Sequence, residues 1–399
     1  MKVKQRPDDF RVEELSSAIP TVSGAYAFYR LEKRGWTTPD ALAMVRRRWK
    51  IDSRRISFGG LKDRHAHTIQ YLTIHNGPER NLSHDTFAIS YLGRLNGAYT
   101  SEQIRANGFA VTLRGLSSPE LNRIEEALPE VAEIGVPNYF DDQRFGSVND
   151  GRSFVAKEMV LGHFEEALRL ALAAPYEHDR EQAKREKTIL KDHWGDWPAC
   201  RMKLRPGHAR DVVNYLVHQP DDFRGACARL EPDLQGMYLA AWQSHLWNRM
   251  LSRWLNDRVP PDRRIEIRLK TGEVVMPRSL DTNTRTEWEN LTLPLPSARL
   301  KIDPEAPWAD VISAVMEEEG IPLEEMRIKG MRQPFFSKGD LIGRVPVTNL
   351  SWTPREDELN RGQQALELKF ELPRGCYATM IVKRLTATMS LEPRVNNDG

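Results

Sequence analysis

The chain has 399 residues, of which 40% are hydrophobic and 29% charged, enough for two or three domains with a sizeable apolar core. Its formal net charge is only +2, and this composition argues against a fibrous or a globally disordered protein. The sequence has no run of 18 apolar residues, no apolar N-terminal segment and no closely spaced pair among its 3 cysteines. We therefore expect a cytoplasmic protein without a membrane span, a secretory signal, disulfides or a structural metal.

The first third of the chain alternates apolar and polar residues as β-strands do. This alternation predicts strands over residues 7–15, 26–31, 55–58, 67–74 and 107–113. Thr38 as N-cap, followed by Pro39 and Asp40, predicts a helix that reaches about residue 49. Apolar residues at helical spacing predict a second helix over residues 119–134.

The middle of the chain is richer in helix signals. Helical spacing of apolar residues predicts helices over residues 154–173, 237–255 and 309–319. Gly320 is placed to end the last of these helices, and Thr271-Gly272 predicts a hairpin between two short apolar runs. Strand-like runs return at residues 366–372 and 378–382. We therefore expect an α+β protein in which a helix-rich middle is inserted into a strand-rich domain made from both chain ends.

Basic residues are concentrated in two stretches. Residues 1–70 contain 15 Lys and Arg but only 8 Asp and Glu, with six cations between residues 46 and 55. A second basic stretch runs from Lys184 to Arg210. A basic face on a nearly neutral protein is typical of nucleic-acid binding, and a solvated helix face is the alternative interpretation.

The densest polar segment runs from Gly59 to Gln70, between two predicted strands. It contains Asp63 between Lys62 and Arg64, and neighbouring cations favour the ionised form of a carboxyl group. An ionised carboxylate can act as a nucleophile, a base or a metal ligand. The alternative from the spacing alone is a surface ion pair in a hairpin loop.

Two further segments combine aromatic and polar residues. The first, from Pro137 to Gly146, contains Asn138 and Phe140, residue types that can read a base edge and stack on a base face. In the second, a Pro-x-Gly turn places Tyr377 at the start of the predicted strand over residues 378–382. An ordinary turn and a core tyrosine remain the alternatives.

Together and in this order, these segments resemble the TruD family of tRNA pseudouridine synthases. The family pattern G-x-K-D-[RK]-x-A-x-T-x-Q matches residues 60–70, and N-Y-F-G-x-Q-R-F-G matches residues 138–146 except at Asp141, where the family has Gly. The closing L-P-x-G-x-[FY]-A-T matches residues 372–379, and the N-terminal K-x-x-P-[ED]-D-F-x-V-x-E matches residues 4–14. The resemblance therefore spans nearly the whole chain.

The resemblance implies specific roles for the matched residues. Asp63 corresponds to the catalytic aspartate, and Lys4 to a basic residue that lies near it in the folded protein. The remaining matched positions are expected to serve the substrate site: Asn138, Phe140, Tyr377, Lys62, Gln70 and Glu14.

The resemblance also implies the architecture and the reaction. A pseudouridine-synthase catalytic domain with a mixed, mainly antiparallel sheet and helices is expected over residues 1–152 and 346–399, and a family-specific inserted α/β domain, the TRUD domain, over residues 153–345. The expected substrate is tRNA, at the uridine of position thirteen, with no cofactor, no metal and a monomeric enzyme. Two rival interpretations are a non-catalytic RNA-binding protein on the same fold and a metal-dependent nuclease that uses Asp63, Asp141 and Asp142.

Overall fold

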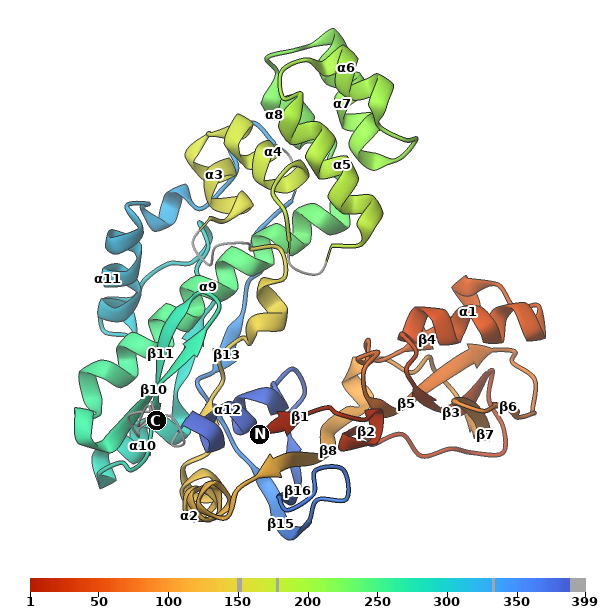
Figure 1. Cartoon of the computed structure of the whole chain (residues 1–399), viewed down its shortest axis with the longest axis vertical. Helices are drawn as coiled ribbons and strands as arrows, with labels where there is room; N and C mark the ends of the chain where they lie inside the picture. The colour runs from red at the N-terminus through yellow and green to blue at the C-terminus, as the bar shows by residue number, and fades with distance from the viewer. Residues whose placement is uncertain (149–152, 177–178, 332–333, 388–399) are drawn as a thin grey trace, which may run out of the picture. The chain divides into compact units, whose positions relative to one another are not determined.

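The computed structural model describes residues 1–148, 153–176, 179–331 and 334–387 (Figure 1). The chain forms two compact units, Met1–Val136 with Val345–Gly399, and Pro137–Arg344. The chain crosses between them at the short paired strands β9 (Val136–Pro137) and β14 (Arg344–Val345). The first crossing comes earlier than the expected domain end at residue 152, so the described part of residues 137–152 belongs to the second unit.

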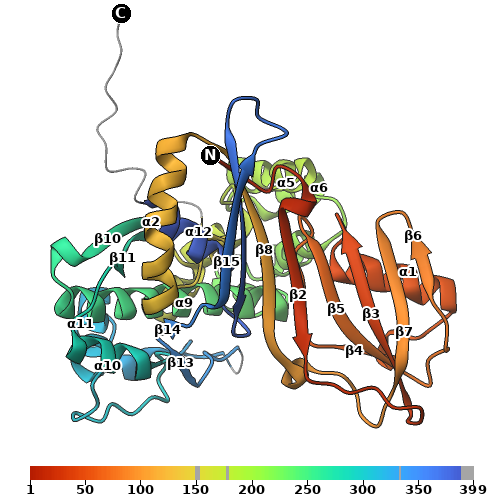
Figure 2. The ribbon, with the colours of Figure 1, turned by 90° about the horizontal axis from the view of Figure 1, so that it is seen from below.

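Among the described residues of the first unit, ten strands form one sheet. Eight of them follow the order β15-β16-β8-β2-β5-β3-β7-β6, while β1 pairs with β8 and β4 with β5. Figure 2 shows the strands side by side from β15 to β6. The strands are β1 (Lys2–Val3), β2 (Phe10–Ser16), β3 (Tyr26–Arg34), β4 (Ile56–Phe58), β5 (His67–His75), β6 (Leu82–His84), β7 (Phe87–Leu95), β8 (Ile104–Leu116), β15 (Thr348–Glu356) and β16 (Gln364–Leu372).

Strand direction makes this sheet mixed but mainly antiparallel. The pair β2 and β5 is parallel, whereas β2–β8, β8–β16, β15–β16, β3–β5 and β3–β7 are antiparallel. The α+β class and the mainly antiparallel sheet expected from the sequence are therefore confirmed. The C-terminal strands β15 and β16 complete the sheet beside β8, so both ends of the chain build the first unit.

In the described part of this unit, three helices cover one face of the sheet: α1 (Thr38–Trp49), α2 (Ser118–Ile134) and α12 (Ala378–Ala387). One apolar core joins β2, β8 and β16 to α2 and α12, and a second joins β3, β5 and β7 to α1. Val12 of the first core is paired with Thr68, which lies on the same side of β5 as Leu72 of the second core. Because paired residues point to the same side of a sheet, both cores lie on one face.

Residues 378–382 form the first turns of α12, so the prediction of a strand there is wrong. The run is apolar and β-branched, which favours a strand locally. However, Ala378, Ile381 and Leu385 recur at helical spacing, and all three are buried in the core that contains α2. Tertiary packing on α2 thus overrides the local preference, and Tyr377 precedes a helix instead of starting a strand.

Two predicted helices differ in detail. The N-cap of α1 is Thr37, whose hydroxyl accepts the Asp40 N–H at 3.2 Å, and Thr38 is instead buried. The helix expected over residues 154–173 is two helices, because Gly162 at φ +83° ends the first of them. A left-handed residue of this kind is a common helix stop.

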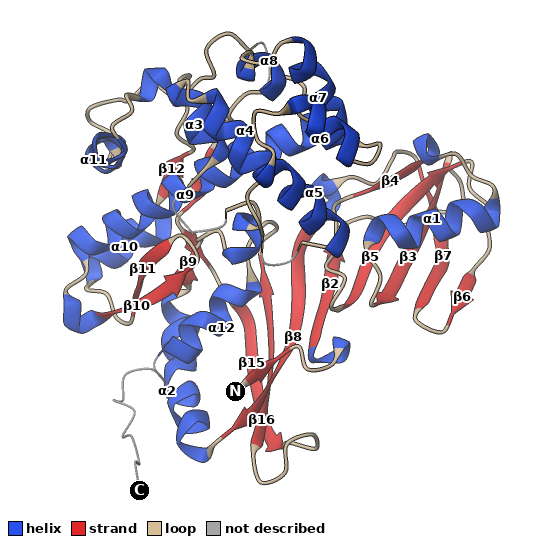
Figure 3. Cartoon of the chain, turned by 45° about the horizontal axis from the view of Figure 1, so that its top comes forward, coloured by secondary structure: helices blue, strands red, loops and turns tan. Residues whose placement is uncertain are grey.

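The second unit is mostly helical (Figure 3). Its helices are α3 (Val155–Leu161), α4 (Phe164–Leu172), α5 (Glu181–Asp192), α6 (Trp197–Lys203), α7 (His208–His218), α8 (Phe223–Cys227), α9 (Pro232–Arg258), α10 (Thr282–Asn290) and α11 (Ala309–Glu319). Among its described residues, small sheets are formed by β10 (Arg264–Leu269) with β11 (Gly272–Pro277), and by β12 (Thr292–Pro294) with β13 (Asp340–Ile342). The predicted hairpin at Thr271-Gly272 and the end of α11 at Gly320 are confirmed.

Across the described ranges of the chain, none of the helices has the length and apolar character needed to span a membrane.

Candidate active site

Polar residues occupy inward positions at the centre of the large sheet, between its two apolar cores. In β2, Phe10 and Val12 are followed on the same side by Glu14; in β3, Tyr29 and Leu31 are followed by Lys33. On the neighbouring strands, Asn107 of β8 is paired with Glu14, and Gln70 of β5 is paired with Leu31, so both lie on the same side of the sheet. All four polar residues are buried, with at most 7% of their surface exposed. Buried polar groups need partners, and the loop between β4 and β5 supplies many of them.

This loop, residues 59–66, contains Asp63 and is held by its main chain. The Gln70 amide donates to the carbonyl of Gly60 at 3.1 Å, and the Thr38 hydroxyl accepts the N–H of Lys62 at 3.1 Å. Thr38 also donates to the Gln70 side-chain oxygen at 2.8 Å, so the two side chains support each other. Hydrogen bonds to main-chain atoms fix the path of the loop regardless of its exposed side chains.

Lys33 binds two carbonyls of this loop and one of the segment that follows β3. Its ammonium donates to the carbonyls of Lys62 at 3.2 Å and Asp63 at 2.9 Å, and to that of Trp36 at 2.8 Å. The side chain is completely buried. Burial lowers the pKa of Lys33 to about 8, although the Asp63 carboxylate acts in the opposite direction. We call Lys33, Thr38 and Gln70 the loop-anchoring residues.

The expected closeness of Lys4 and Asp63 is confirmed. The Lys4 Nζ lies 3.4 Å from the Asp63 Oδ2 and 4.1 Å from the centre of the Phe10 ring. The side chains of Lys4 and Asp63 are 29% and 34% exposed, so a ligand can reach both. The pair therefore presents a carboxylate with a fixed countercharge at the surface of an otherwise buried polar centre.

The backbone of Lys4 has φ +58°, a left-handed conformation that residues other than glycine rarely adopt. Such conformations persist where the surrounding structure determines them. On one side, β1 pairs Lys2 with Arg114 and Val3 with Leu113 of β8. On the other side, the 3-10 helix η1 (Pro7–Asp9) ends in the buried Asp9.

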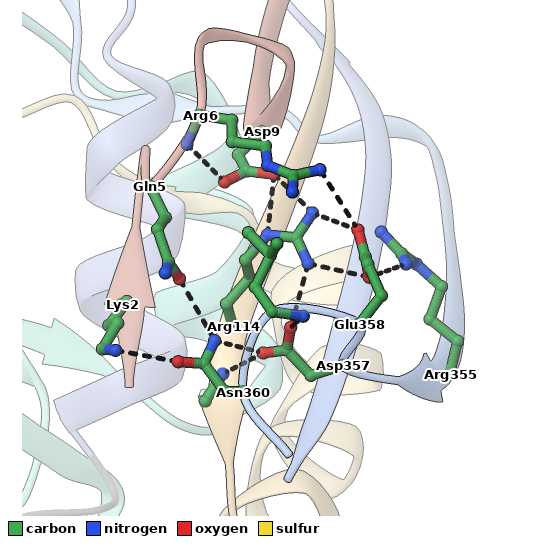
Figure 4. Close-up of polar contacts among 11 residues, drawn as sticks. Lys2, Gln5, Arg6, Asp9, Arg114, Arg355, Asp357, Glu358 and Asn360 are labelled. Carbon is green, nitrogen blue, oxygen red and sulfur yellow. Dashed lines mark hydrogen bonds and ion pairs between the residues drawn. The ribbon is translucent and has the colours of Figure 1, made fainter.

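Asp9 belongs to an ion cluster around the buried Arg114 (Figure 4). The Arg114 guanidinium bonds to Asp9 at 2.8 Å, to Asp357 at 3.0 Å and to Glu358 at 2.9 Å. These carboxylates come from the N-terminal segment and from the turn between β15 and β16. The hydrogen bond from Arg114 lowers the pKa of Glu358 to about 2. Hydrogen bonds to Glu358 and Asp9 in turn raise the pKa of Arg114. This set, which we call the Arg114 cluster, ties the segment that carries Lys4 to the sheet.

Three of the predicted substrate-binding residues contact other residues of the protein: Lys62, Glu14 and Gln70. The Lys62 Nζ lies 3.2 Å from the Glu14 carboxylate and donates to Asn107 at 2.7 Å. Burial raises the pKa of Glu14, and Lys62 acts against that shift. Since Glu14 and Gln70 are 1% and 0% exposed, their contacts give them a supporting place beneath the loop. Their substrate-binding role stays a prediction.

Tyr377 lies in the turn between β16 and α12, where Gly375 adopts φ +86°. It is half-buried, and its carbonyl accepts the N–H of Met380 at 3.0 Å in the first turn of α12. Arg374 of the same turn donates to the carbonyl of Ser101 at 2.6 Å. The turn is thus fixed to the first unit, and the stacking role expected of Tyr377 stays a prediction.

Asn138 and Phe140 belong to the second unit. The Asn138 side chain donates to the carbonyl of Ile342 at 2.9 Å. The main chain of Phe140 exchanges two hydrogen bonds of 2.9 Å with the side chain of Asn248 in α9, and its ring packs edge-on against Trp247. The segment is therefore rigidly held by α9, and its part in the substrate site stays a prediction.

Asp141 occupies the position where the family pattern has glycine. Its backbone has φ −84° and ψ 169°, an extended conformation open to any residue, so the substitution causes no backbone strain. The carboxylate of its neighbour Asp142 accepts the Lys270 N–H at 2.6 Å. Within the described residues, no three His, Cys, Asp or Glu side chains are grouped as metal ligands would be.

Sequence reasoning did not find Lys33 or Arg114, and it assigned Thr38 to the start of a helix instead of to the site. A signal for some of them exists: Lys33 continues the buried side of a strand whose previous members, Tyr29 and Leu31, are apolar. A charged residue at an inward strand position needs a buried partner. Such a position in a sequence therefore indicates a buried polar site.

A hollow of about 450 Å³ lies in the first unit on the other side of the sheet from Asp63. Arg11, Glu13 and Lys369 are among the residues around it, and they alternate with the inward residues of β2 and β16. It is therefore separate from the candidate active site.

Comparisons with known proteins identify the family of the chain. The family model described as "tRNA pseudouridine synthase D (TruD)" matches residues 1–385. "Probable tRNA pseudouridine synthase D 2" of Methanocaldococcus jannaschii is 29% identical over 392 residues, covering 96% of this chain and 91% of the relative. "tRNA pseudouridine synthase D" of Leptospira interrogans is 27% identical over 394 residues, covering 96% and 95%. A crystal structure described as a TruD protein from Methanosarcina mazei matches with a TM-score of 0.71 and 26% identity, covering 98% of this chain and 94% of that one.

Proposed function

Because the chain belongs to the TruD family of tRNA pseudouridine synthases, which are isomerases, we propose that it converts the uridine at position thirteen of tRNA to pseudouridine, with Asp63 as the catalytic residue and without a cofactor. The observation that carries this proposal is the partly exposed Lys4–Asp63 pair, in which Asp63 lies on a loop fixed by its main chain. The fold and the matched motifs support it.

The reaction breaks the N1–C1′ bond of uridine and forms a C5–C1′ bond to the same ring. The base gains a proton at N1 and loses one from C5, so no atom or electron enters from a further reactant. An ionised carboxylate beside the sugar can start this rearrangement by attacking C1′ or by removing the C2′ proton. Both routes require Asp63 to be charged.

Lys4 suits this requirement, because its ammonium lies 3.4 Å from the Asp63 carboxylate. The same ammonium rests on the Phe10 ring, which restricts its position. We propose that Lys4 keeps Asp63 ionised and oriented while substrate displaces the surrounding water.

The target base must leave its stack to reach Asp63, which costs a few kcal/mol, on the order of 2–4. We propose that Tyr377 offsets part of this cost by stacking on the base, and that Asn138 and Phe140 contribute to its recognition. Cations of the basic stretches, such as those of α1, supply contacts to phosphates.

The proposal is tested by tritium release from tRNA labelled with [5-³H]uridine, comparing wild type with Asp63→Asn. Wild type is expected to release tritium, and Asp63→Asn to lose at least about 1,000-fold in rate, since the nucleophile or base is removed. Binding of tRNA by the variant should stay within about twofold, because the side-chain volume is kept. A transcript with cytidine at position thirteen is the matched substrate control.

Each rival gives a different result. Release that stops on adding EDTA would indicate a metal-dependent reaction, and cleaved tRNA a nuclease. Binding of tRNA without release from any transcript would indicate the non-catalytic RNA-binding alternative. Release from the position-thirteen control would move the target to another uridine, and normal turnover by Asp63→Asn would exclude Asp63 as the catalytic residue.

A further inference from the structure

Lys33 is a lysine without solvent access in the interior of the first unit. Its three N–H groups have three acceptors, and all of them are main-chain carbonyls, of Trp36, Lys62 and Asp63. A charged ammonium satisfies all three carbonyls, whereas a neutral amine has only two N–H groups. The number of loop contacts therefore depends on whether Lys33 is protonated.

Two of the three acceptors flank the backbone of the catalytic residue. The carbonyls of Lys62 and Asp63 lie on either side of the Asp63 Cα, so the Lys33 ammonium fixes the peptide unit from which the Asp63 side chain extends. The Asp63 carboxylate must also meet Lys4, which comes from a different segment. A small shift of the loop would therefore separate the pair.

We propose that Lys33 is a positioning residue of the synthase, whose protonated ammonium holds the Asp63 loop in its active position and releases it when the proton is lost. This inference rests on the proposed function, because it concerns the placement of Asp63 for that reaction. Lys33 itself touches no reacting atom.

The electrostatic surroundings of Lys33 place this transition in an accessible pH range. Burial lowers its pKa to about 8; the Asp63 carboxylate raises the pKa and the Lys62 ammonium lowers it. Opposite Lys33 in the sheet stand Thr68 of β5 and Phe87 of β7, which carry no charge. The catalytic rate should therefore fall as the pH rises through about 8.

The first experiment measures kcat, KM and tRNA affinity between pH 6.5 and 9.5 for wild type and Lys33→Met. Wild-type kcat should fall by about tenfold between pH 7.5 and 9.5, with tRNA affinity changed less than about twofold. Lys33→Met should show kcat lower by at least about tenfold at pH 7, because a small misplacement of a catalytic group has effects of this size. Its kcat should lack the decline at high pH.

Leu31→Ala is the matched control, because Leu31 is a buried residue of the same strand and the same side, within the apolar core under α1. It lowers stability without removing a hydrogen bond to the loop, so its decline of kcat with pH should match that of wild type. A decline shared by wild type, Leu31→Ala and Lys33→Met, or a wild-type kcat in Lys33→Met, would overturn the inference.

The second experiment needs neither a variant nor activity. Hydrogen exchange of the wild-type peptide covering residues 60–66, corrected for the intrinsic effect of pH, should speed up by at least about fivefold between pH 7 and pH 9.5. Unchanged protection would contradict the release of the loop. This result decides the matter even if Lys33→Met fails to fold. If wild type forms no pseudouridine at any pH, the proposed function fails, and exchange alone still tests Lys33.

Discussion

The two halves of the Lys4–Asp63 pair are held in different ways. The segment with Lys4 is fixed through charges on side chains, since Arg114 meets Asp9, Asp357 and Glu358 at 2.8–3.0 Å. The loop with Asp63 is fixed through its main chain by Lys33, Thr38 and Gln70. Around Arg114 opposite charges are in direct contact, whereas the contacts of Lys33 are neutral carbonyls.

This difference separates stability from positioning. A buried charge surrounded by opposite charges is compensated. Removing it leaves those opposite charges buried in the low-dielectric interior without a countercharge. A buried ammonium bound to carbonyls retains part of its desolvation cost, which its lowered pKa reflects. We therefore expect the Arg114 cluster to govern folding, and the loop-anchoring residues to govern catalysis more than folding.

Arg114→Met should have the largest effect on stability. It leaves the buried Asp9 and Asp357 without their cation and should lower the free energy of unfolding by about 3–5 kcal/mol. Urea denaturation monitored by tryptophan fluorescence measures the change. Arg355→Met is the control, because Arg355 pairs with the same Glu358 from a partly exposed position, where about 0–1 kcal/mol is expected. Equal effects of the two variants would remove the distinction between the cluster and a surface ion pair.

The pH dependence of wild-type stability should reveal the cost of Lys33. Its pKa is about 8 in the folded protein and 10.5 in the unfolded reference, so between these values the unfolded chain binds more protons. The free energy of unfolding attributable to this group should therefore rise with pH from about 8 to about 10.5, by on the order of 3 kcal/mol. Below pH 8 the contribution is constant.

The measurement compares urea denaturation of wild type and Lys33→Met across this pH range. The difference between the two free energies isolates Lys33 from tyrosines and other groups that titrate nearby. Parallel curves would mean that the ammonium is not destabilised by burial, and the contrast with Arg114 would disappear.

Thr38→Val should have a smaller effect on stability than Arg114→Met. It removes the hydroxyl that bonds Lys62 and Gln70, and should cost about 1–2 kcal/mol while lowering kcat severalfold at unchanged KM. Thr37→Val is the matched control, because it removes the N-cap of α1 at a similar cost of about 1 kcal/mol. If the two variants lower kcat equally, the effect of Thr38 acts through the helix and not through the loop.

Periodicity predicted the elements whose burial follows one regular pattern. Strands β2, β3, β5 and β8 and helices α2 and α11 lie close to their expected ranges because one face of each is apolar. Periodicity failed where packing on a distant element determines the structure. Helix α12 is helical because it packs on α2, and the local sequence does not contain that information. No elements were predicted for the stretch that forms α5 to α8, whose sequence matched no motif.

For the candidate site, the motifs identified residues but not their arrangement. Asp63 and Lys4 were found because their motifs are dense and ordered along the chain. The sequence did not reveal that Glu14 and Gln70 are buried, because membership in a motif does not distinguish a residue beneath a loop from one that faces a ligand. It also missed Lys33, since only the register of β3 with β5 and β7 places it beneath the loop.

The split of the first unit between both ends of the chain has a consequence for synthesis. Strands β15 and β16, with Asp357 and Glu358, are translated only after all of residues 137–344. At roughly 5–20 residues per second, β8 waits on the order of 10–40 seconds at the ribosome with one edge unpaired and Arg114 lacking two of its carboxylates. The second unit can acquire its own core in that interval, so the part of the protein that carries Asp63 is the last to reach its native form.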